Sequence, residues 1–353
     1  MSVRLASLAA LLLSTSLHAQ QTETLEVVLQ RAPSAAPGIP AAPLPTTPLH
    51  YRTGEGLDIE VTALARGLNH PWGLAVLPDG TLLVSERNKG ILRSIHDGRI
   101  DPTPVAGVPL VKEDGGAFTG LLDVVLHPDF NTNSYVYLTY NKALADDKAA
   151  MAVARGIWDG TALQETTDVF VADPGVSGAS RVLFDGQGHL YMSIYGGSDD
   201  AQDLNQLRGK VLRLNEDGSI PSDNPFISTG GARPEIYTYG HRTIQALVSN
   251  PLTQQIWSLE MGPNGGDEVN ILKAGANYGW PLVSLGRDYA GPWQSEDFRK
   301  EGFENPVAYW MPSISVSGMT FYTGTLLDKW QGDLFVGGLR MGDPQLAGFP
   351  TLT

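Results

Sequence analysis

A phrase of apolar and turn-forming segments recurs five times along the chain. Each copy places a short apolar run before a turn of Pro, Asp, Asn and Gly, and a second run rich in Leu, Val, Tyr and Trp after it. This pattern predicts a β-hairpin, because turn residues between two apolar runs reverse an extended chain. The copies are Gly73–Arg87, Asp123–Tyr140, Ser180–Gly196, Ala246–Gly262 and, more loosely, Gly318–Arg340.

The spacing of these copies predicts a repeat architecture. They begin about 50–70 residues apart, which is typical of propellers. In a propeller, loops from several blades converge on one axis, so we expect one axial pocket. Among 353 residues there are 40 Gly and 24 Pro, with 42% hydrophobic content, which suits a turn-rich all-β protein with a large core.

The N-terminal segment has a different composition from the repeats. Residues 1–19 contain Arg4, a short apolar stretch and a small-residue end at Ala19, which predicts a cleaved signal peptide. Residues 20–50 are rich in Pro and Ala and are expected to form a flexible arm, followed by a β-propeller domain over 51–353. The chain has no cysteine. An export signal without cysteine predicts a periplasmic or secreted protein.

Charge and the C-terminus add two further expectations. The net charge of −14 argues against nucleic acid and anionic membranes as partners, and the apolar N-terminal stretch is too short for a membrane span. The sequence stops about twenty residues after the apolar segment Leu334–Val336, so we expect an incomplete last blade, because a propeller closes by completing its last sheet.

Several longer motifs carry a resemblance to a known family. They are Asn69-His70-Pro71-Trp72-Gly73-Leu74, Leu126-His127-Pro128-Asp129-Phe130, Gly209-Lys210-Val211-Leu212-Arg213-Leu214, Gly240-His241-Arg242, Gly266-Asp267-Glu268-Val269-Asn270 and Asn277-Tyr278-Gly279-Trp280-Pro281. From about Gly67 to Arg340 the chain resembles the soluble sugar dehydrogenases that use pyrroloquinoline quinone (PQQ), the glucose/sorbosone or aldose sugar dehydrogenase family. The resemblance implies a six-bladed β-propeller that oxidises an aldose or other alcohol at C–OH with PQQ and Ca²⁺, and passes electrons to an external acceptor.

The resemblance also implies binding residues for the cofactor and its metal ion. Arg242 and Arg340 match arginines that pair with the PQQ carboxylates, a task suited to a bidentate guanidinium. Gly262 and Pro263 match the pair whose backbone carbonyls hold the active-site Ca²⁺, and hard cations prefer such oxygen ligands. His241 beside Arg242 is interpreted either as an orienting residue or as a packed histidine at a blade end.

A second, structural Ca²⁺ is implied near the end of the fourth phrase. Glu268 and Tyr278 match its ligands, Tyr278 through its backbone oxygen. The residues alone leave a second interpretation open, in which Asp267 and Glu268 form a turn that makes backbone hydrogen bonds.

Two positions of the expected pocket differ from the family pattern. The family's base is a histidine in a His-Phe-Gly-Ser/Gly-Arg-Leu pattern, and Ser177 stands in its place in the stretch Ser177–Val182. A serine hydroxyl is a poor base at neutral pH, whereas imidazole suits proton transfer there. Phe118 replaces a glutamine that contacts the cofactor, and Tyr195-Gly196-Gly197 replaces a Gly-Asp-Arg or Gly-Asp-Gln motif.

Three classes of function follow from these observations. The first is a quinoprotein dehydrogenase in which another loop supplies the base, because catalysis needs spatial and not sequential proximity. The second is a Ca²⁺-dependent propeller hydrolase, such as a lactonase, in which the metal polarises a carbonyl or activates water. The third is a non-catalytic carbohydrate-binding propeller derived from the enzyme, which the loss of both the base and the glutamine would fit.

Overall fold

The computed structural model describes residues 45–112, 118–197, 200–289 and 291–339. The chain divides into two compact units, one made of Met1–Leu44 with Tyr289–Pro292 and the other of Pro45–Asp288 with Trp293–Thr353. The second unit contains every strand described below. The predicted signal peptide, nearly all of the predicted arm and Arg340 lie outside the described residues.

Four antiparallel four-stranded sheets follow one another along the chain. Their strands are β3 (Pro71–Val76), β4 (Leu82–Glu86), β5 (Ile91–His96) and β6 (Arg99–Ile100); β7 (Leu121–Leu126), β8 (Tyr135–Ala143), β9 (Ala149–Trp158) and β10 (Leu163–Val171); β11 (Val182–Phe184), β12 (His189–Ile194), β13 (Lys210–Asn215) and β14 (Ile236–Tyr239); β15 (Thr243–Ser249), β16 (Ile256–Met261), β17 (Asp267–Ile271) and β18 (Ala308–Trp310). In each sheet the strands pair in chain order, so every sheet is a meander.

Two smaller sheets flank these four in sequence. β1 (Leu49–Arg52) pairs with β2 (Asp58–Val61), and β19 (Val316–Phe321) pairs with β20 (Leu334–Gly338). The helical segments within the described residues are single turns, at η1 (Arg87–Lys89), α2 (Phe130–Asn133) and η2 (Asp328–Trp330). The prediction of an all-β propeller-like fold is confirmed. No helix in the described ranges has the length and apolar character needed to cross a membrane.

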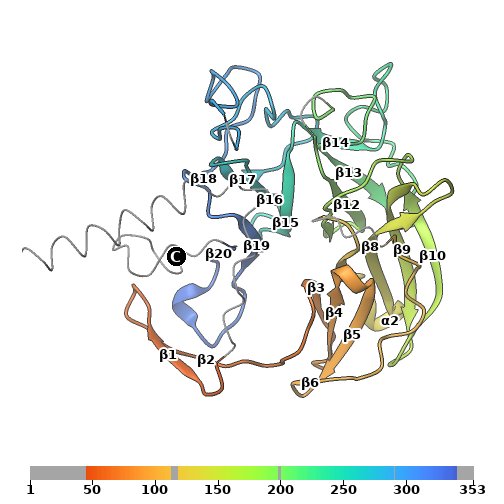
Figure 1. Ribbon diagram of the computed structural model, residues 1–353, viewed down its shortest axis with the longest axis vertical. Helices are drawn as coiled ribbons and strands as arrows, with labels where there is room; N and C mark the ends of the chain where they lie inside the picture. The colour runs from red at the N-terminus through yellow and green to blue at the C-terminus, as the bar shows by residue number, and fades with distance from the viewer. Residues whose placement is uncertain (1–44, 113–117, 198–199, 290, 340–353) are drawn as a thin grey trace, which may run out of the picture. The chain divides into compact units, whose positions relative to one another are not determined.

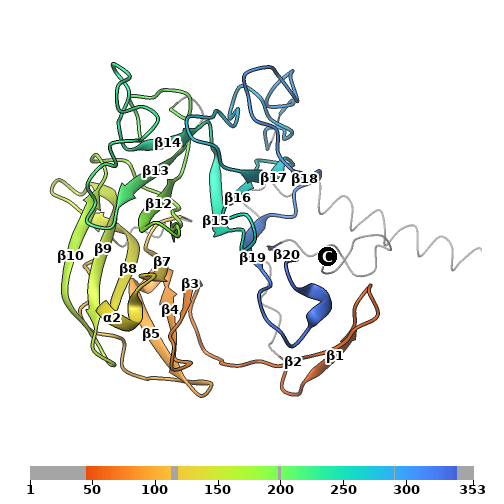
Figure 2. The same ribbon diagram turned by 180° about the vertical axis from the view of Figure 1, so that it is seen from behind.

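The five repeated phrases correspond to the first hairpins of five successive sheets. They form the pairs β3–β4, β7–β8, β11–β12, β15–β16 and β19–β20. The first strand of each of these sheets also contacts the first strand of the next sheet, which places the sheets side by side in chain order (Figures 1 and 2).

The hydrophobic core lies between neighbouring sheets. On β8, Val136, Leu138 and Tyr140 face a cluster shared with the first sheet, while Tyr137 faces a cluster shared with the third sheet. This alternation follows from the two-residue period of a strand. Because both faces of β8 are covered, its sequence is apolar at successive positions. Similar clusters lie between the third and fourth sheets and between the fourth sheet and β19–β20.

One arginine links the first strands of four sheets. Arg181 directly precedes β11, and its Nη1 donates to the Trp72 carbonyl (3.2 Å) on β3 and to Asp123 Oδ1 (3.3 Å) on β7. Its Nη2 donates to the Ser317 carbonyl (3.4 Å) on β19. Asp123 Oδ2 in turn accepts the backbone N–H of Val182 (2.9 Å). Arg181 therefore joins strands that are distant in sequence at the inner edges of the sheets.

Candidate functional site at one end of the sheets

The residues singled out in the sequence gather at one end of the sheets. Phe118 precedes β7, Ser177 precedes β11 and Arg242 precedes β15, whereas Tyr195 follows β12 and Gly262 follows β16. In an antiparallel hairpin, the start of the first strand and the end of the second strand lie together. The fold thus brings loops from three successive sheets to a common end.

Phe118 and the Ser177 loop meet at Tyr195. The rings of Phe118 and Tyr195 stack with centroids 5.7 Å apart and an interplanar angle of 22°. On the other side, a Cβ added at Gly178 would lie 2.7 Å from the Cβ of Tyr195, so the loop backbone rests directly on this tyrosine. Phe118 and Gly178, the residue after Ser177, therefore share one structural neighbour.

The backbone of the Ser177 loop has a conformation that favours glycine. Gly178 has a φ of +131°, a conformation that residues with a side chain rarely adopt. The family pattern has Phe at this position, and a side chain here would collide with Tyr195. The glycine at position 178 therefore fits the backbone conformation and the close contact with Tyr195.

Arg242 lies over an aromatic ring and beside two carbonyl groups. Its Nη1 donates to the carbonyls of Met261 and Gly262, each at 3.0 Å, and its guanidinium lies 5.4 Å from the ring centre of Trp280. Trp280 is held in turn by a 2.7 Å hydrogen bond from its Nε1 to the Gly197 carbonyl. A guanidinium on an aromatic face is a suitable place for a flat anionic ligand.

His241 is a buried orienting residue. Its side chain lies 2.9 Å from Glu260 through Nδ1 and 2.9 Å from the Thr238 hydroxyl through Nε2, and its ring stacks on Tyr278 with centroids 4.7 Å apart. The same Glu260 carboxylate accepts the backbone N–H of Arg242. His241 is therefore both packed and orienting, because it fixes the carboxylate that holds the Arg242 backbone. Its two ring nitrogens are engaged, so it does not face substrate as a base.

The expected ligands of the active-site cation are only partly available. Gly262 and Pro263 are both buried, and the Gly262 carbonyl accepts the hydrogen bond from Arg242. A guanidinium and a Ca²⁺ ion on the same carbonyl would repel each other. Coordination of a cation by Gly262 therefore requires Arg242 to turn toward another acceptor, such as a ligand carboxylate.

Glu268 lies in an electrostatic environment that favours a cation. Burial, together with the nearby carboxylates of Glu260 and Asp267, raises the pKa of its carboxyl to about 8, against a hydrogen bond from Asn270 (3.3 Å) that lowers it. A bound cation would reverse this shift, because it would stabilise the ionised carboxylate. Tyr278 is buried in the segment after β17, where its hydroxyl donates to the Ile271 carbonyl (2.7 Å), within electrostatic reach of Glu260.

The carboxylate of Asp267, next to Glu268, is already occupied by hydrogen bonds from other protein groups. It accepts the backbone N–H of Gly262 (3.0 Å), the hydroxyl of Ser313 (2.8 Å) and the backbone N–H of Val316 (3.4 Å). Asp267 therefore makes backbone hydrogen bonds, as the second interpretation expected, but from the first position of β17 and not from a turn. Within the described ranges no three His, Cys, Asp or Glu side chains form a metal-binding group, so Ca²⁺ at Glu268 would depend on carbonyl oxygens and water for its remaining ligands.

Two tryptophans at this end have contacts that their motifs did not predict. Trp72 has the guanidinium of Arg87 at 5.1 Å and that of Arg181 at 5.2 Å from its ring centre. Trp280 supports Arg242, as described above. Both tryptophans lie next to a glycine in motifs that carry the family resemblance. This position in the motifs was the only indication in the sequence that the tryptophans could belong to the site.

Known proteins are similar to this chain in sequence and fold. The sequence profile of the glucose / sorbosone dehydrogenase family matches residues 68–345. The aldose sugar dehydrogenase YliI of Escherichia coli (strain K12) is 41% identical over 297 residues, covering 81% of this chain and 79% of that protein. The crystal structure of the soluble aldose sugar dehydrogenase from Escherichia coli in the apo-form superposes with a TM-score of 0.72 at 40% identity, covering 77% of this chain and 81% of that one.

A more distant solved structure is a PQQ-bound form. The PQQ-bound form of the aldose sugar dehydrogenase from Streptomyces coelicolor superposes with a TM-score of 0.64 at 30% identity, covering 84% of this chain and 80% of that one. The propeller-like fold and the matched motifs define an oxidoreductase of the sugar dehydrogenase type. The chain belongs to the glucose / sorbosone dehydrogenase family.

Proposed function

We propose that the protein oxidises an aldose or another alcohol at a C–OH group, with PQQ as the cofactor and Ca²⁺ as the metal ion, and passes the electrons to an external acceptor. The observation that carries the proposal is the Arg242 guanidinium lying over Trp280 and beside the Gly262 carbonyl. This arrangement combines an anion-binding group, a flat apolar surface and a cation ligand within one set of contacts.

The residues of this end suit a planar, anionic cofactor. PQQ, when bound, supplies a quinone that accepts a hydride from the carbon bearing the hydroxyl. Arg242 would pair with a cofactor carboxylate, which would also release the Gly262 carbonyl for the metal ion. Phe118 offers a flat apolar ring in place of an amide, and stacking on Tyr195 orients that ring.

Three residues near the site, Ser177, His241 and Asp123, are poorly suited to accept the proton of the substrate hydroxyl. Ser177 cannot accept the hydroxyl proton efficiently, and His241 is buried with both ring nitrogens engaged. Asp123, on the inner edge of β7, is held by Arg181 and Val182. We therefore infer an oxidation that is slow with the family's usual sugars, or one that uses a substrate able to lose its proton without a strong base.

Three wider features belong to the same proposal. A six-bladed propeller is proposed in which β19–β20 and β1–β2 contribute to blades beyond the four complete sheets. Glu268 and the backbone oxygen of Tyr278 would hold a structural Ca²⁺. A periplasmic or secreted location follows from the predicted signal peptide, and it would place the enzyme where extracellular sugars are available.

The test is a titration of the purified protein with PQQ and with Ca²⁺, followed by absorbance and by thermal melting. PQQ binding should require Arg242, so Arg242→Met should abolish the absorbance change. Ca²⁺ should raise the melting temperature relative to chelator by mass action, and Glu268→Gln should remove that rise. If neither ligand binds, the dehydrogenase proposal fails, and the loss of the base and the glutamine would instead favour a non-catalytic carbohydrate-binding propeller.

A further inference from the structure

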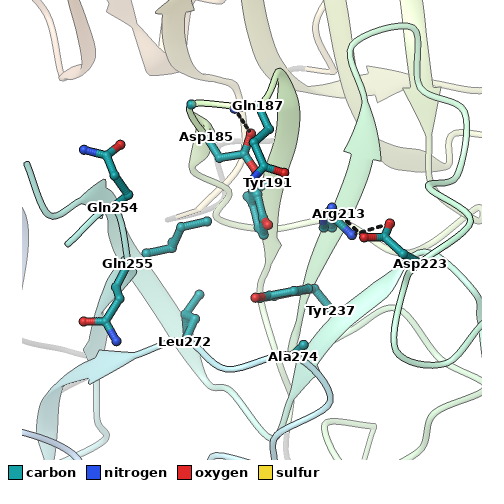
Figure 3. A pocket seen from close by; sticks show the side chains of 12 residues that line it. Asp185, Gln187, Tyr191, Arg213, Asp223, Tyr237, Gln254, Gln255, Leu272 and Ala274 are labelled. Carbon is teal, nitrogen blue, oxygen red and sulfur yellow. Dashed lines mark hydrogen bonds and ion pairs between the residues drawn. The ribbon is translucent and has the colours of Figure 1, made fainter.

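A cavity of about 610 Å³ lies between the third and fourth sheets, away from the candidate site. The turn of the β11–β12 hairpin contributes Asp185 and Gln187, and the turn of the β15–β16 hairpin contributes Gln254 and Gln255 (Figure 3). These turns lie at the opposite end of the hairpins from Ser177 and Arg242. The volume is in the range of about 300–1,000 Å³ that is usual for small-molecule sites.

Two tyrosines form the inner wall of this cavity. Tyr191 on β12 and Tyr237 on β14 meet edge to face, with ring centroids 5.0 Å apart and an interplanar angle of 89°. Burial raises the pKa of both hydroxyls, and the two hydroxyls interact with each other. Aromatic rings with polar ends are suited to ligands that carry both C–H and O–H groups.

The charged residues of the cavity already have partners. Arg213 makes two hydrogen bonds to Asp223, at 2.8 Å from Nη1 and 3.3 Å from Nη2. Asp185 accepts the backbone N–H groups of Gln187 (2.8 Å) and His189 (2.9 Å), and its second oxygen lies 3.0 Å from the His189 ring. A charged ligand would have to displace these contacts, so the lining favours a neutral one.

Amide side chains from the second hairpin form the outer wall. Gln254 Nε2 donates to the Pro251 carbonyl (3.1 Å), and Gln255 Oε1 accepts from the Thr253 hydroxyl (3.1 Å). Each amide is thus oriented through one end, while its other end can donate or accept. Gly186 on the facing turn has no side chain, and a Cβ there would approach Gln254 Oε1 to 3.6 Å, so the two turns are close neighbours.

We propose that this cavity is a second binding site, for a neutral carbohydrate such as a disaccharide, and that it is separate from the dehydrogenase site. Ligand hydroxyls would exchange hydrogen bonds with Gln255 and with the Tyr237 hydroxyl, and a C–H face of the sugar would rest on the Tyr237 ring, because Tyr191 is only 4% exposed and supports that ring from the core. Such a site would retain the protein near sugar polymers or products without oxidising them. It does not depend on PQQ, and so it goes beyond the proposed function.

Trehalose is a suitable probe, because it is neutral and has no free anomeric hydroxyl for an aldose dehydrogenase to oxidise. Its binding to the full chain without PQQ can be measured by saturation-transfer NMR and by calorimetry. Tyr237→Phe and Gln255→Ala should each weaken binding roughly fivefold, as expected for the loss of one hydrogen bond. Tyr239→Phe is the matched control, because Tyr239 lies on the same strand but outside the cavity lining. This variant should bind trehalose as tightly as the wild-type protein does.

The second set of variants separates the two ends of the molecule. Arg242→Met should leave trehalose binding unchanged, and Tyr237→Phe should leave PQQ binding unchanged. If wild-type protein binds neither trehalose nor maltotriose, or if Arg242→Met removes the binding while Tyr237→Phe and Gln255→Ala do not, the second site is overturned. Melting curves of each variant show whether a change in binding reflects a change in folding.

Discussion

Ser177 and Gly178 lie in the loop that directly precedes Arg181 and β11. Ser177 provides no effective base, and Gly178 fits a backbone conformation that the family's phenylalanine would not adopt. Since β11 and Arg181 follow directly, the loop can vary while the inner edge of the third sheet stays in place.

Restoring the base should increase activity. Ser177→His should raise dye-linked aldose oxidation in the presence of PQQ and Ca²⁺, by up to roughly 10²–10⁴-fold, which is the usual contribution of general-base catalysis. Steady-state rates with glucose across pH 5–9 would measure it, and a rise through the imidazole pKa would identify the new group. Ser177→Gln is the control, because it adds bulk without a base. Equal rates for Ser177→His, Ser177→Gln and wild type would mean that proton transfer does not occur at this position.

Lys210 is a buried cation that makes the stability of the protein depend on pH. Its Nζ donates to the carbonyls of Asp200 (2.8 Å), Ala201 (3.1 Å) and Arg208 (2.7 Å), and burial lowers its pKa from 10.5 to about 7. Between about pH 7 and 10.5 the unfolded chain therefore holds one more proton than the folded protein. Its contribution to the free energy of unfolding rises with pH by up to about 1.4 kcal/mol per unit in this range.

Lys210→Met provides the test of that pH dependence. Urea unfolding of both proteins at several pH values gives the difference in free energy of unfolding, wild type minus variant, in which other titrating groups cancel. This difference should grow between pH 7 and pH 9. A constant difference across this range would mean that the three carbonyls hold the protonated amine without an effective burial penalty.

At the scale of elements, the close approach of β3 and β7 depends on Gly73. A Cβ added there would lie 2.8 Å from the Leu122 carbonyl oxygen and 2.8 Å from the Val124 nitrogen, both on β7. Backbone atoms within a strand cannot move aside easily. Gly73→Ala should therefore lower the free energy of unfolding by roughly 1–3 kcal/mol, as overpacking does. Gly230→Ala, with open space around it, should change it little, and equal effects of the two substitutions would contradict this account.

The hairpins were predictable from the sequence, whereas the outer strands were not. Phrases such as Asp123–Tyr140 carry a turn between two apolar runs, and the structure places each at the start of a sheet. The outer strands lack this signal, as on β10, where exposed Gln164 and Glu165 interrupt the pattern and the pairing shifts register. Local pattern records the turn chemistry and burial of an element, but not pairing with a strand far along the chain.

The residues of the candidate site were predictable from the sequence, whereas the contacts between them were not. Phe118, Ser177 and Arg242 were identified from motifs, and the structure places their loops at one end. The contacts that join them, such as Phe118 with Tyr195 and Arg242 with Trp280, connect residues that are distant in sequence. Motif spacing carries no record of such contacts, and neither does it record the cavity between Tyr191 and Gln255.

At the scale of the whole molecule, Arg181 should be one of the most important residues for stability. It is largely buried, and Arg181→Met would remove its bonds to Trp72 and Ser317 and leave the Asp123 carboxylate without its cation. Loss of one partner of a buried ion pair costs about 3 kcal/mol or more. Arg52→Met removes an exposed pair with Asp58 and should cost less than about 1 kcal/mol. Denaturant midpoints for the two variants would show the difference, and similar midpoints would contradict it.

The bond from Arg181 to Ser317 has a consequence for how the molecule unfolds. Sheets that touch only their neighbours in chain order can separate one at a time, and stability then spreads along the series as in a repeat protein. Arg181 connects β11 with β19 across the fourth sheet, which lies between them in sequence. Detaching that sheet from one neighbour still leaves the third sheet tied to β19. The Arg181 side chain thus adds a contact between sheets that are not neighbours in chain order. The third sheet, the fourth sheet and β19–β20 are therefore expected to unfold more cooperatively than contacts between neighbouring sheets alone would allow.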